Sequence, residues 1–178
     1  MKDLLKIIVL SNALISIGFG NCDSDEVELW DECYSITNTT WLGRINEGLT
    51  GEIPSEIGQL TNLVTLKLQY NELTGSIPPE IGNLTSLVKL DLRYNNLSGS
   101  IPTEVWSLTS LKELRIQKNQ FSGTIPSAIG NLTELTHLYL YGNQFTGSIP
   151  AEIGNLINLA KLHLNNNQFT GLIPETIC

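Results

Sequence analysis

The chain has 178 residues, of which 41% are hydrophobic and 16% are charged. These proportions are those of one ordinary globular domain, and they argue against a disordered chain or a fibre. The formal net charge at pH 7 is −8, so any positively charged surface must be local.

Residues 1–20 are predicted to be a secretory signal peptide. Lys2 and Lys6 give the segment a basic start, residues 7–17 are largely apolar, and small residues precede a cleavage site ahead of Asn21. The apolar run falls well short of the roughly 20 residues that a membrane span requires. We therefore expect a secreted or cell-surface protein with no membrane span in this sequence.

The three cysteines all follow the predicted signal peptide. In an oxidising compartment Cys22 and Cys33 are close enough in sequence to form a disulfide. A lipid anchor on Cys22 is the alternative, and Asn21 before it fits that alternative poorly. Cys178 is then a free thiol, a link to another chain, or half of a bridge whose partner lies beyond the end. We favour the last of these interpretations.

Residues 21–38 are predicted to form an N-terminal cap. Acidic residues surround Leu29, Trp30 and Tyr34 in this segment, so its apolar side chains can cover the domain that follows while the acids face water. A calcium site would also use clustered carboxylates, but their spacing does not match a loop that wraps an ion. We expect no metal site.

From residue 39 onward the chain repeats with a period of 24 residues. The clearest unit is residues 63–86, LVTLKLQYNELTGSIPPEIGNLTS. A fixed period of this length predicts a solenoid of about six copies in residues 39–178, the last one truncated. The other copies begin at Thr39, which starts a degraded copy, and at Leu87, Leu111, Leu135 and Leu159.

The spacing within a copy predicts one short strand and a return arm. Leu66 and Leu68 alternate with polar residues, as in a strand with one buried face. Gly75 and Pro78 predict a turn, after which Ile81 faces the core from the return arm. The fold class is therefore an α/β repeat solenoid, curved, with a parallel β-sheet on the concave face and irregular or 3-10 return arms on the convex face.

An asparagine recurs at the point where each strand ends and its backbone loses ladder partners. Its amide can pair with those backbone groups, so we assign this column a structural role. The first copy departs from the pattern, with Arg44 in place of a core leucine and Glu47 in place of the asparagine. The column is Asn71, Asn95, Asn119, Asn143 and Asn167.

The pattern LxxLxLxxNxLxGxIPxEIGxL in residues 63–84, present again in residues 135–156, resembles the plant-type leucine-rich repeat. That repeat occurs in polygalacturonase-inhibiting proteins and in the ectodomains of plant receptor-like kinases, and the resemblance covers residues 49–177. It implies a secreted, curved solenoid that binds proteins, peptides or carbohydrate on its strand face and has no catalysis of its own. A fragment of a receptor-like kinase ectodomain is an alternative.

The residues that the repeat leaves free on the strand face are the candidate ligand-binding residues. Most basic residues beyond the signal peptide fall there, and only Asp91 and Glu113 among the acids share the face. Tyrosine and arginine are frequent binding anchors, so we expect an extracellular protein, peptide or acidic glycan as the partner. The structural alternative is cross-strand pairing of Asp91 with Lys67 and with Arg115. The candidates are Lys67, Gln69, Tyr70, Lys89, Asp91, Arg93, Tyr94, Arg115, Gln117, Lys118, His137, Tyr139, Tyr141, Lys161 and His163.

An enzymatic function is disfavoured. His137 and His163 could act with Glu113 or Asp91 in acid–base or metal chemistry. An open concave face offers no desolvated pocket to shift their pKa values. We expect no catalytic residue and no cofactor.

An ice-binding function is the other alternative, on an array of threonine and serine side chains. Glu52 and Leu172 interrupt this array, and its hydroxyls are better explained as partners of nearby backbone groups. The array is Thr74, Ser76, Ser98, Ser100, Ser122, Thr124, Thr146 and Ser148.

Four sequons would be glycosylated in a eukaryotic secretory pathway and would carry no meaning in a bacterium. Phosphate-binding loops, zinc-ligand spacings and nucleic-acid motifs are missing from the sequence, so no nucleic-acid partner is expected. The sequons are at Asn38, Asn83, Asn96 and Asn131.

Overall fold

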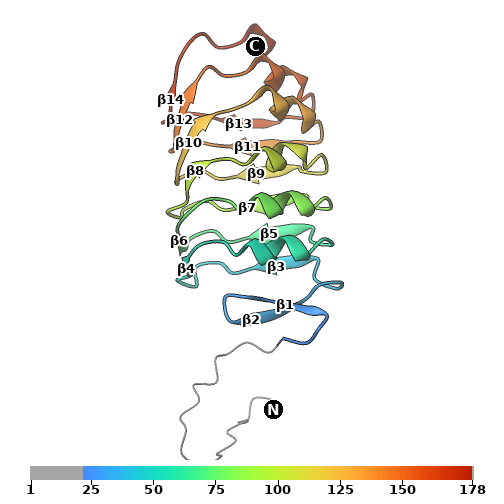
Figure 1. Ribbon diagram of the computed structural model, residues 1–178. Coiled ribbons are helices and arrows are strands. Elements are labelled where there is room, and N and C mark those ends of the chain that lie inside the picture. The colour runs from blue at the N-terminus through green and yellow to red at the C-terminus, as the bar shows by residue number, and fades with distance from the viewer. Residues whose placement is uncertain (1–21, 178) are drawn as a thin grey trace, which may run out of the picture.

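The computed structural model describes residues 22–177. The predicted signal peptide, residues 1–20, and Cys178 lie outside the described residues, so what we expect of them stays a prediction. Figure 1 shows one turn of chain for each copy, stacked in sequence order from the N-terminal cap to the last copy. Within the described part of the chain, no helix has the length and apolar character needed to cross a bilayer.

The N-terminal cap is an antiparallel hairpin of β1 (Glu26–Leu29) and β2 (Glu32–Ser35). Leu29 is fully buried in the core of the stack. The predicted disulfide is present and joins Cys22, ahead of β1, to Cys33 in β2. The hairpin therefore covers the apolar N-terminal end of the stack.

The strands of successive copies pair in parallel, which confirms the predicted sheet. Within residues 22–177 this main sheet has six strands in the order β13, β11, β9, β7, β5, β3. Leu66 is the register partner of Leu90, and Leu90 is that of Leu114; all three are fully buried. The strands are β3 (Trp41–Gly43), β5 (Thr65–Lys67), β7 (Lys89–Asp91), β9 (Glu113–Arg115), β11 (His137–Tyr139) and β13 (Lys161–His163).

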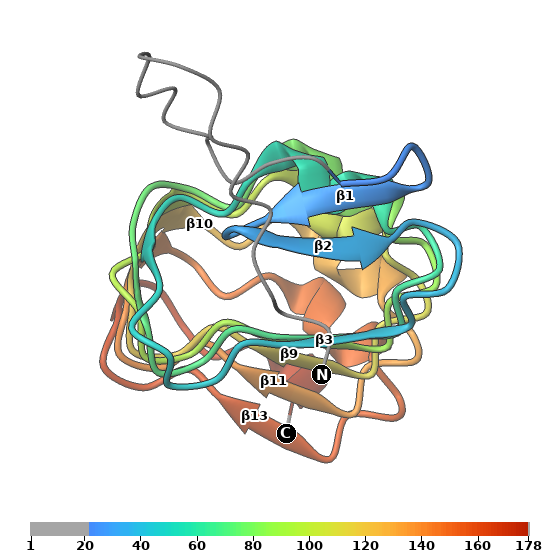
Figure 2. The same ribbon diagram turned by 90° about the horizontal axis from the view of Figure 1, so that it is seen from below.

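The return arms contain short 3-10 helices on the opposite side of each turn from the main sheet, as Figure 2 shows. Each of the first five follows a proline in an extended conformation, such as Pro78 at φ −68°. Ile81 and Leu84 of one such arm are fully buried, which confirms the expected return arms. The helices are η1 (Ser55–Gln59), η2 (Pro79–Asn83), η3 (Thr103–Ser107), η4 (Ser127–Asn131), η5 (Ala151–Asn155) and η6 (Glu175–Ile177).

A second parallel sheet, which the sequence analysis missed, runs along one side of the stack (Figure 1); its strands follow those of the main sheet in the chain and precede the helices. Its register pairs Gly99 with Phe121 and Gly123 with Phe145, an offset of 22 residues instead of the 24 of the repeat. When the copies are aligned by their 24-residue period, the paired residues of this sheet fall in different columns, so the alignment does not reveal the pairing. Its strands are β8 (Ser98–Ser100), β10 (Gln120–Thr124), β12 (Gln144–Gly147) and β14 (Gln168–Phe169), and β4 (Thr50–Gly51) pairs separately with β6 (Glu72–Leu73).

Each asparagine of the column bonds backbone groups of two neighbouring copies. Oδ1 of Asn119 accepts a hydrogen bond from the N–H of Leu97 at 3.1 Å. Its Nδ2 donates to the carbonyl oxygens of Leu92 and Ile116 at 3.0 and 3.1 Å. Buried backbone groups that the strands leave open are thus paired by a side chain. The arrangement recurs at Asn71, Asn95, Asn143 and Asn167.

Candidate ligand-binding face

The concave face presents its side chains in rows that run across the strands. In the first two rows, neighbours are register partners of the main sheet; strands in a sheet are spaced about 4.8 Å apart. The next two rows follow the strand ends and are linked by backbone hydrogen bonds, such as that from Tyr70 N–H to the carbonyl of Arg93 at 3.1 Å. The first row is Trp41, Thr65, Lys89, Glu113, His137 and Lys161; the second is Gly43, Lys67, Asp91, Arg115, Tyr139 and His163. The third is Gln69, Arg93, Gln117, Tyr141 and Asn165; the fourth is Asn46, Tyr70, Tyr94, Lys118 and Gly142.

A pocket of about 300 Å³ opens on this face between the second and third rows. It combines two guanidinium groups, two phenols and an imidazole, and no carboxylate is among its lining residues. Such a pocket suits an anionic or hydrogen-bond-accepting group. Asn165 is the one lining residue that the sequence analysis missed, because nothing distinguishes it from the other asparagines of its segment. The lining is Arg93, Arg115, Gln117, Tyr139, Tyr141, His163 and Asn165.

The carboxylates of the face are committed to ion pairs beside the pocket. Glu113 lies 2.7 Å from Nζ of Lys89 and accepts a hydrogen bond from Nε of Arg115 at 2.9 Å. Oδ1 of Asp91 lies 3.4 Å from Nε of Arg93, an ion pair without hydrogen-bond geometry, since that Nε has no hydrogen-bond partner. Two acids therefore face three bases, and the face keeps an excess of positive charge.

The predicted partners of Asp91 are wrong. Lys67 and Arg115 are its register partners on the two neighbouring strands, but neither forms an ion pair with it within residues 22–177. Arg115 turns instead to Glu113 on its own strand, and Asp91 is reached by Arg93. Register settles which backbones are adjacent, whereas the rotamers of long side chains decide which charges meet.

The two carboxylates have pKa values displaced in opposite directions. For Asp91, burial raises the pKa, and the positive charge of Arg93 only partly offsets this. For Glu113, burial acts in the same sense, but the hydrogen bond from Lys89 and the charge of Arg115 outweigh it, so the pKa is lowered. Glu113 is thus the ionised anchor of the basic side chains at the pocket.

Aromatic rings and cations alternate along the face. The rings of Tyr70 and Tyr94 stack with centroids 4.8 Å apart, and the guanidinium of Arg93 lies 5.3 Å from the centroid of Tyr70. Arg115 lies 5.0 Å from the centroid of Tyr139, whose ring is 4.8 Å from that of His163. Cation–π contacts of this kind hold guanidinium groups in defined orientations. Burial raises the pKa of Tyr141, so its phenol stays protonated and can donate.

The fourth row holds its residues in the left-handed conformation. Tyr70, Tyr94 and Lys118 have φ values of 62°, 54° and 59°, where a side chain with a Cβ is strained. Gly142 occupies the same row at φ 68° without that strain. Glycine would fit this position without strain, yet two copies carry a tyrosine there. We therefore infer that the side chains of Tyr70 and Tyr94 have a role beyond packing.

Three of the candidate residues are not accessible, contrary to expectation. Asp91, Gln69 and Gln117 are only 2%, 6% and 3% exposed. Oε1 of both glutamines is buried and has no hydrogen-bond partner among residues 22–177. These three side chains thus form the floor of the face, and the more exposed residues around them are the ones that a ligand would contact.

The two histidines lie beside a hydroxyl and aromatic rings. Nδ1 of His137 lies 2.9 Å from Oγ1 of Thr136, and its register partner Glu113 is held by Lys89 and Arg115. His163 is exposed and contacts tyrosine rings. Among residues 22–177, no carboxylate forms an ion pair with either imidazole; such a pair would orient a histidine as a base.

Three hydroxyls of the threonine and serine array, those of Thr74, Ser98 and Thr146, donate hydrogen bonds to backbone carbonyls. Oγ1 of Thr74 donates to the carbonyl of Gly51 at 3.2 Å, and Oγ1 of Thr146 donates to that of Gly123 at 3.3 Å. These bonds join one copy to the preceding one, which is a structural use of the hydroxyl. The array therefore gains no support as an ice-binding surface from its geometry.

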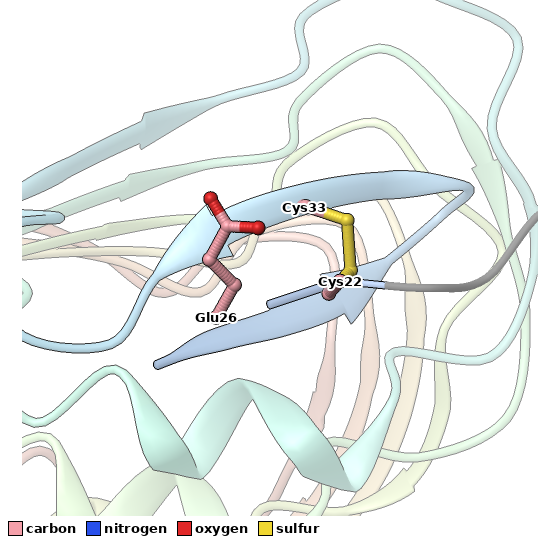
Figure 3. A group of neighbouring side chains, drawn as sticks. All are labelled: Cys22, Glu26 and Cys33. Carbon is pink, nitrogen blue, oxygen red and sulfur yellow. A yellow bond between two sulfur atoms is a disulfide. The ribbon is translucent and has the colours of Figure 1, made fainter. Parts of the chain in front are cut away.

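Figure 3 shows Cys22, Glu26 and Cys33, whose side chains cluster at the cap. Both sulfur atoms are consumed by the disulfide, so they are not the thiolates that a metal ion would bind. A carboxylate of Glu26 accepts the N–H of Asp23 at 3.2 Å. One carboxylate beside a disulfide is not a ligand set.

The four sequon asparagines are all exposed: Asn38, Asn83, Asn96 and Asn131. Asn83 and Asn131 end the 3-10 helices η2 and η4. Glycans there would project from the convex side and leave the concave face open. Glycosylation itself stays a prediction.

Comparison with known proteins identifies the family. Residues 47–177 match the family described as a leucine-rich repeat region. The chain belongs to the leucine-rich repeat family, and its repeat is of the plant type found in receptor-kinase ectodomains. No curated protein matches the chain in sequence.

Several solved structures of plant receptors are similar to this chain. The plant peptide hormone receptor RGFR1, in complex with RGF2, is 42% identical with a TM-score of 0.71, and the match covers 72% of this chain and 20% of the receptor. The leucine-rich repeat ectodomain of the membrane receptor kinase GASSHO1/SCHENGEN3 from Arabidopsis thaliana, in complex with CASPARIAN STRIP INTEGRITY FACTOR 2, is 47% identical with a TM-score of 0.71. That match covers 72% of this chain and 16% of the receptor.

A shorter relative is covered more fully. The ectodomain of the receptor kinase SOBIR1 from Arabidopsis thaliana is 33% identical with a TM-score of 0.68, and 73% of each chain is covered. This chain spans a fifth or less of the length of RGFR1 and GASSHO1/SCHENGEN3.

Proposed function

We propose that the chain is an extracellular recognition module that binds a peptide or protein on its concave face, with an acidic group of the ligand seated in the pocket. The observation that carries this is the pocket lining, in which Arg93 and Arg115 converge and no carboxylate takes part. On an acidic protein, a curved basic surface attracts an anionic ligand selectively. The proposal includes secretion, which the predicted signal peptide and the disulfide support.

The similar structures support this choice of ligand class. RGFR1 was solved in complex with RGF2, and HAESA, another similar receptor kinase, with the peptide hormone IDA. Leucine-rich repeat ectodomains of this kind act by binding and not by catalysis, and we propose the same for this chain. The binding face serves equally well in a free protein and in one part of a longer receptor.

Arg115 is prepared for a ligand by its neighbours. Its Nε is held by Glu113 at 2.9 Å, and its guanidinium lies over Tyr139. The terminal nitrogens of the fork are thereby left to meet an oxyanion, and little side-chain entropy remains to be lost on binding. A phenol from Tyr141 and the imidazole of His163 complete the donors at the pocket.

The test is selection of a displayed random peptide library on the immobilised protein, followed by affinity measurement for the selected peptides. We expect acidic peptides, and a loss of affinity of about tenfold or more in Arg93→Gln and Arg115→Gln. Lys112→Gln is the matched control, because Lys112 is exposed and pairs with Glu134 at 4.0 Å, outside the pocket. Full affinity in the double variant of Arg93 and Arg115 would rule the proposal out.

A further inference from the structure

Trp41 forms an exposed aromatic surface at the far end of the concave face from the pocket. Its side chain is 56% exposed, whereas Trp106 is 1% exposed in the core. Trp41 lies in β3, the edge strand of the main sheet (Figure 2), and Leu42 beside it points into the core. An indole that stays exposed to water gains little of the hydrophobic stabilisation that burial would give it. It therefore contributes little to the stability of the fold.

The sequence makes room for this ring at Gly43. A Cβ at position 43 would stand 2.3 Å from Cη2 and 2.4 Å from Cζ2 of Trp41, far closer than atoms can approach. The six-membered ring therefore lies across the backbone of Gly43, while more than half of the Trp41 side chain remains exposed. Gly43 does not have a positive φ, so the ring is what excludes a side chain there.

The neighbours of the ring are polar. Thr65 is the register partner of Trp41, and Lys67 is that of Gly43. Lys67 forms no ion pair with any residue between 22 and 177. The next strand, whose backbone runs about 4.8 Å from that of β3, thus offers a hydroxyl and an ammonium that is not held in an ion pair within residues 22–177.

We propose that Trp41, Thr65 and Lys67 form a second binding site, which takes a pyranose ring of a glycan. A pyranose has a face of C–H groups that stacks on the electron-rich face of an indole, and a rim of hydroxyls that needs hydrogen-bond partners. The open ring supplies the first need, and the Thr65 hydroxyl and Lys67 ammonium supply the second. Aromatic anchors of protein interfaces sit instead in enclosed, desolvated pockets, which the polar neighbours of Trp41 do not form.

This site is separate from the pocket. The pocket residues lie in or directly after β9, β11 and β13, except Arg93, which follows β7. Strand β5 separates all of these strands from β3, which carries Trp41. The two sites can therefore be tested one at a time. Variants of Arg93 and Arg115 should leave glycan binding unchanged, and variants of Trp41 should leave peptide binding unchanged.

The experiment measures tryptophan fluorescence and affinity electrophoresis with three probes: cello-oligosaccharide, chito-oligosaccharide and oligogalacturonate. We expect at least one to bind, with a shift in fluorescence that Trp41→Ala removes. Gly43→Ala keeps the indole but displaces it, and should weaken binding by about tenfold or more. Ile157→Ala removes another exposed apolar side chain, 87% exposed, and should bind as the wild type does.

Three results decide the matter. Binding that is lost in both Trp41→Ala and Gly43→Ala, with circular dichroism unchanged, supports the site. A salt-sensitive preference for oligogalacturonate that Lys67→Gln abolishes supports it too and places the sugar carboxylate at Lys67. Failure of all three probes to bind, or equal binding by Trp41→Ala, overturns the proposal.

Discussion

Glu113 and Lys89, on adjacent strands of the main sheet, form an ion pair at 2.7 Å. The same carboxylate accepts a hydrogen bond from Arg115, so one acid positions two bases at the edge of the pocket. The side chains of Lys89 and Glu113 are partly shielded from water, at 23% and 26% exposed respectively. Substitution of Glu113 therefore tests whether this carboxylate holds Lys89 and Arg115 in place.

Glu113→Gln should lower the free energy of unfolding by about 1 kcal/mol at neutral pH, since partly exposed ion pairs contribute modestly. The pKa of Glu113 is below its ordinary value of 4.5, so its stabilisation is present above that value and is lost as the pH falls through the lowered pKa. Urea unfolding near pH 7 and near pH 3 should show the difference shrinking in acid. Glu134→Gln is the control, since Glu134 is 54% exposed and pairs only at 4.0 Å; an equal loss in both would refute the special role of Glu113.

The repeat made the fold predictable because its apolar columns report burial directly. Leu66 and its counterparts, together with Ile81, define both walls of the core, and the structure confirms the main sheet and the return arms. The offset of 22 residues in the second sheet was not predictable from copies aligned in phase, as Gly99 and Phe121 show.

The candidate site was less predictable than the fold. Alternation along a strand places Gln117 on the concave side but does not predict that the larger side chains of neighbouring strands cover it; Tyr139 and Tyr141 line the pocket beside it. Its burial to 3% exposure is therefore a result of side-chain packing between strands. The ion-pair partners of Asp91 depend on rotamers in the same way.

The asparagine column should be most sensitive to substitution in the middle of the stack. Asn119→Ala leaves the backbone N–H of Leu97 without its partner. It also removes one of the two amide hydrogen bonds to each of the carbonyls of Leu92 and Ile116, which Asn95 and Asn143 still bond. The substitution should cost about 2 kcal/mol. Asn167→Ala removes equivalent bonds at the last described copy, where Asn167 is half-buried and water can replace the amide. Chemical denaturation should therefore give the smaller loss for Asn167, and a larger loss there would contradict the structural role assigned to burial.

Arg44 should tie the cap to the first copy. Its Nη1 lies 3.3 Å from Oε2 of Glu32 and donates to the hydroxyl of Tyr34 at 3.3 Å, while Nε pairs with Glu47. Burial disfavours the charged guanidinium, but these bonds outweigh it and raise its pKa. Arg44→Leu restores the leucine of the repeat and removes the link.

For Arg44→Leu we expect amide hydrogen exchange in β1 and β2 to rise about tenfold while exchange in β9 stays unchanged. The central strand is the internal control, since it would respond only to a loss of global stability. Unchanged exchange in the hairpin would show that the disulfide and Leu29 hold the cap without Arg44.

Lys118 should be a site of stored backbone strain. It is held at φ 59° in the row where Gly142 sits at φ 68°, and a Cβ in this conformation costs roughly 1–2 kcal/mol. Lys118→Gly should therefore be more stable than Lys118→Ala by about 1 kcal/mol, because both lose the same charge and the contact 5.9 Å above the Tyr141 ring, and only the alanine keeps the Cβ. Thermal and urea unfolding of the two variants measure the difference. If alanine were equal to or better than glycine, the left-handed row would be relaxed, and strain would no longer argue for a role of Tyr70 and Tyr94 in binding.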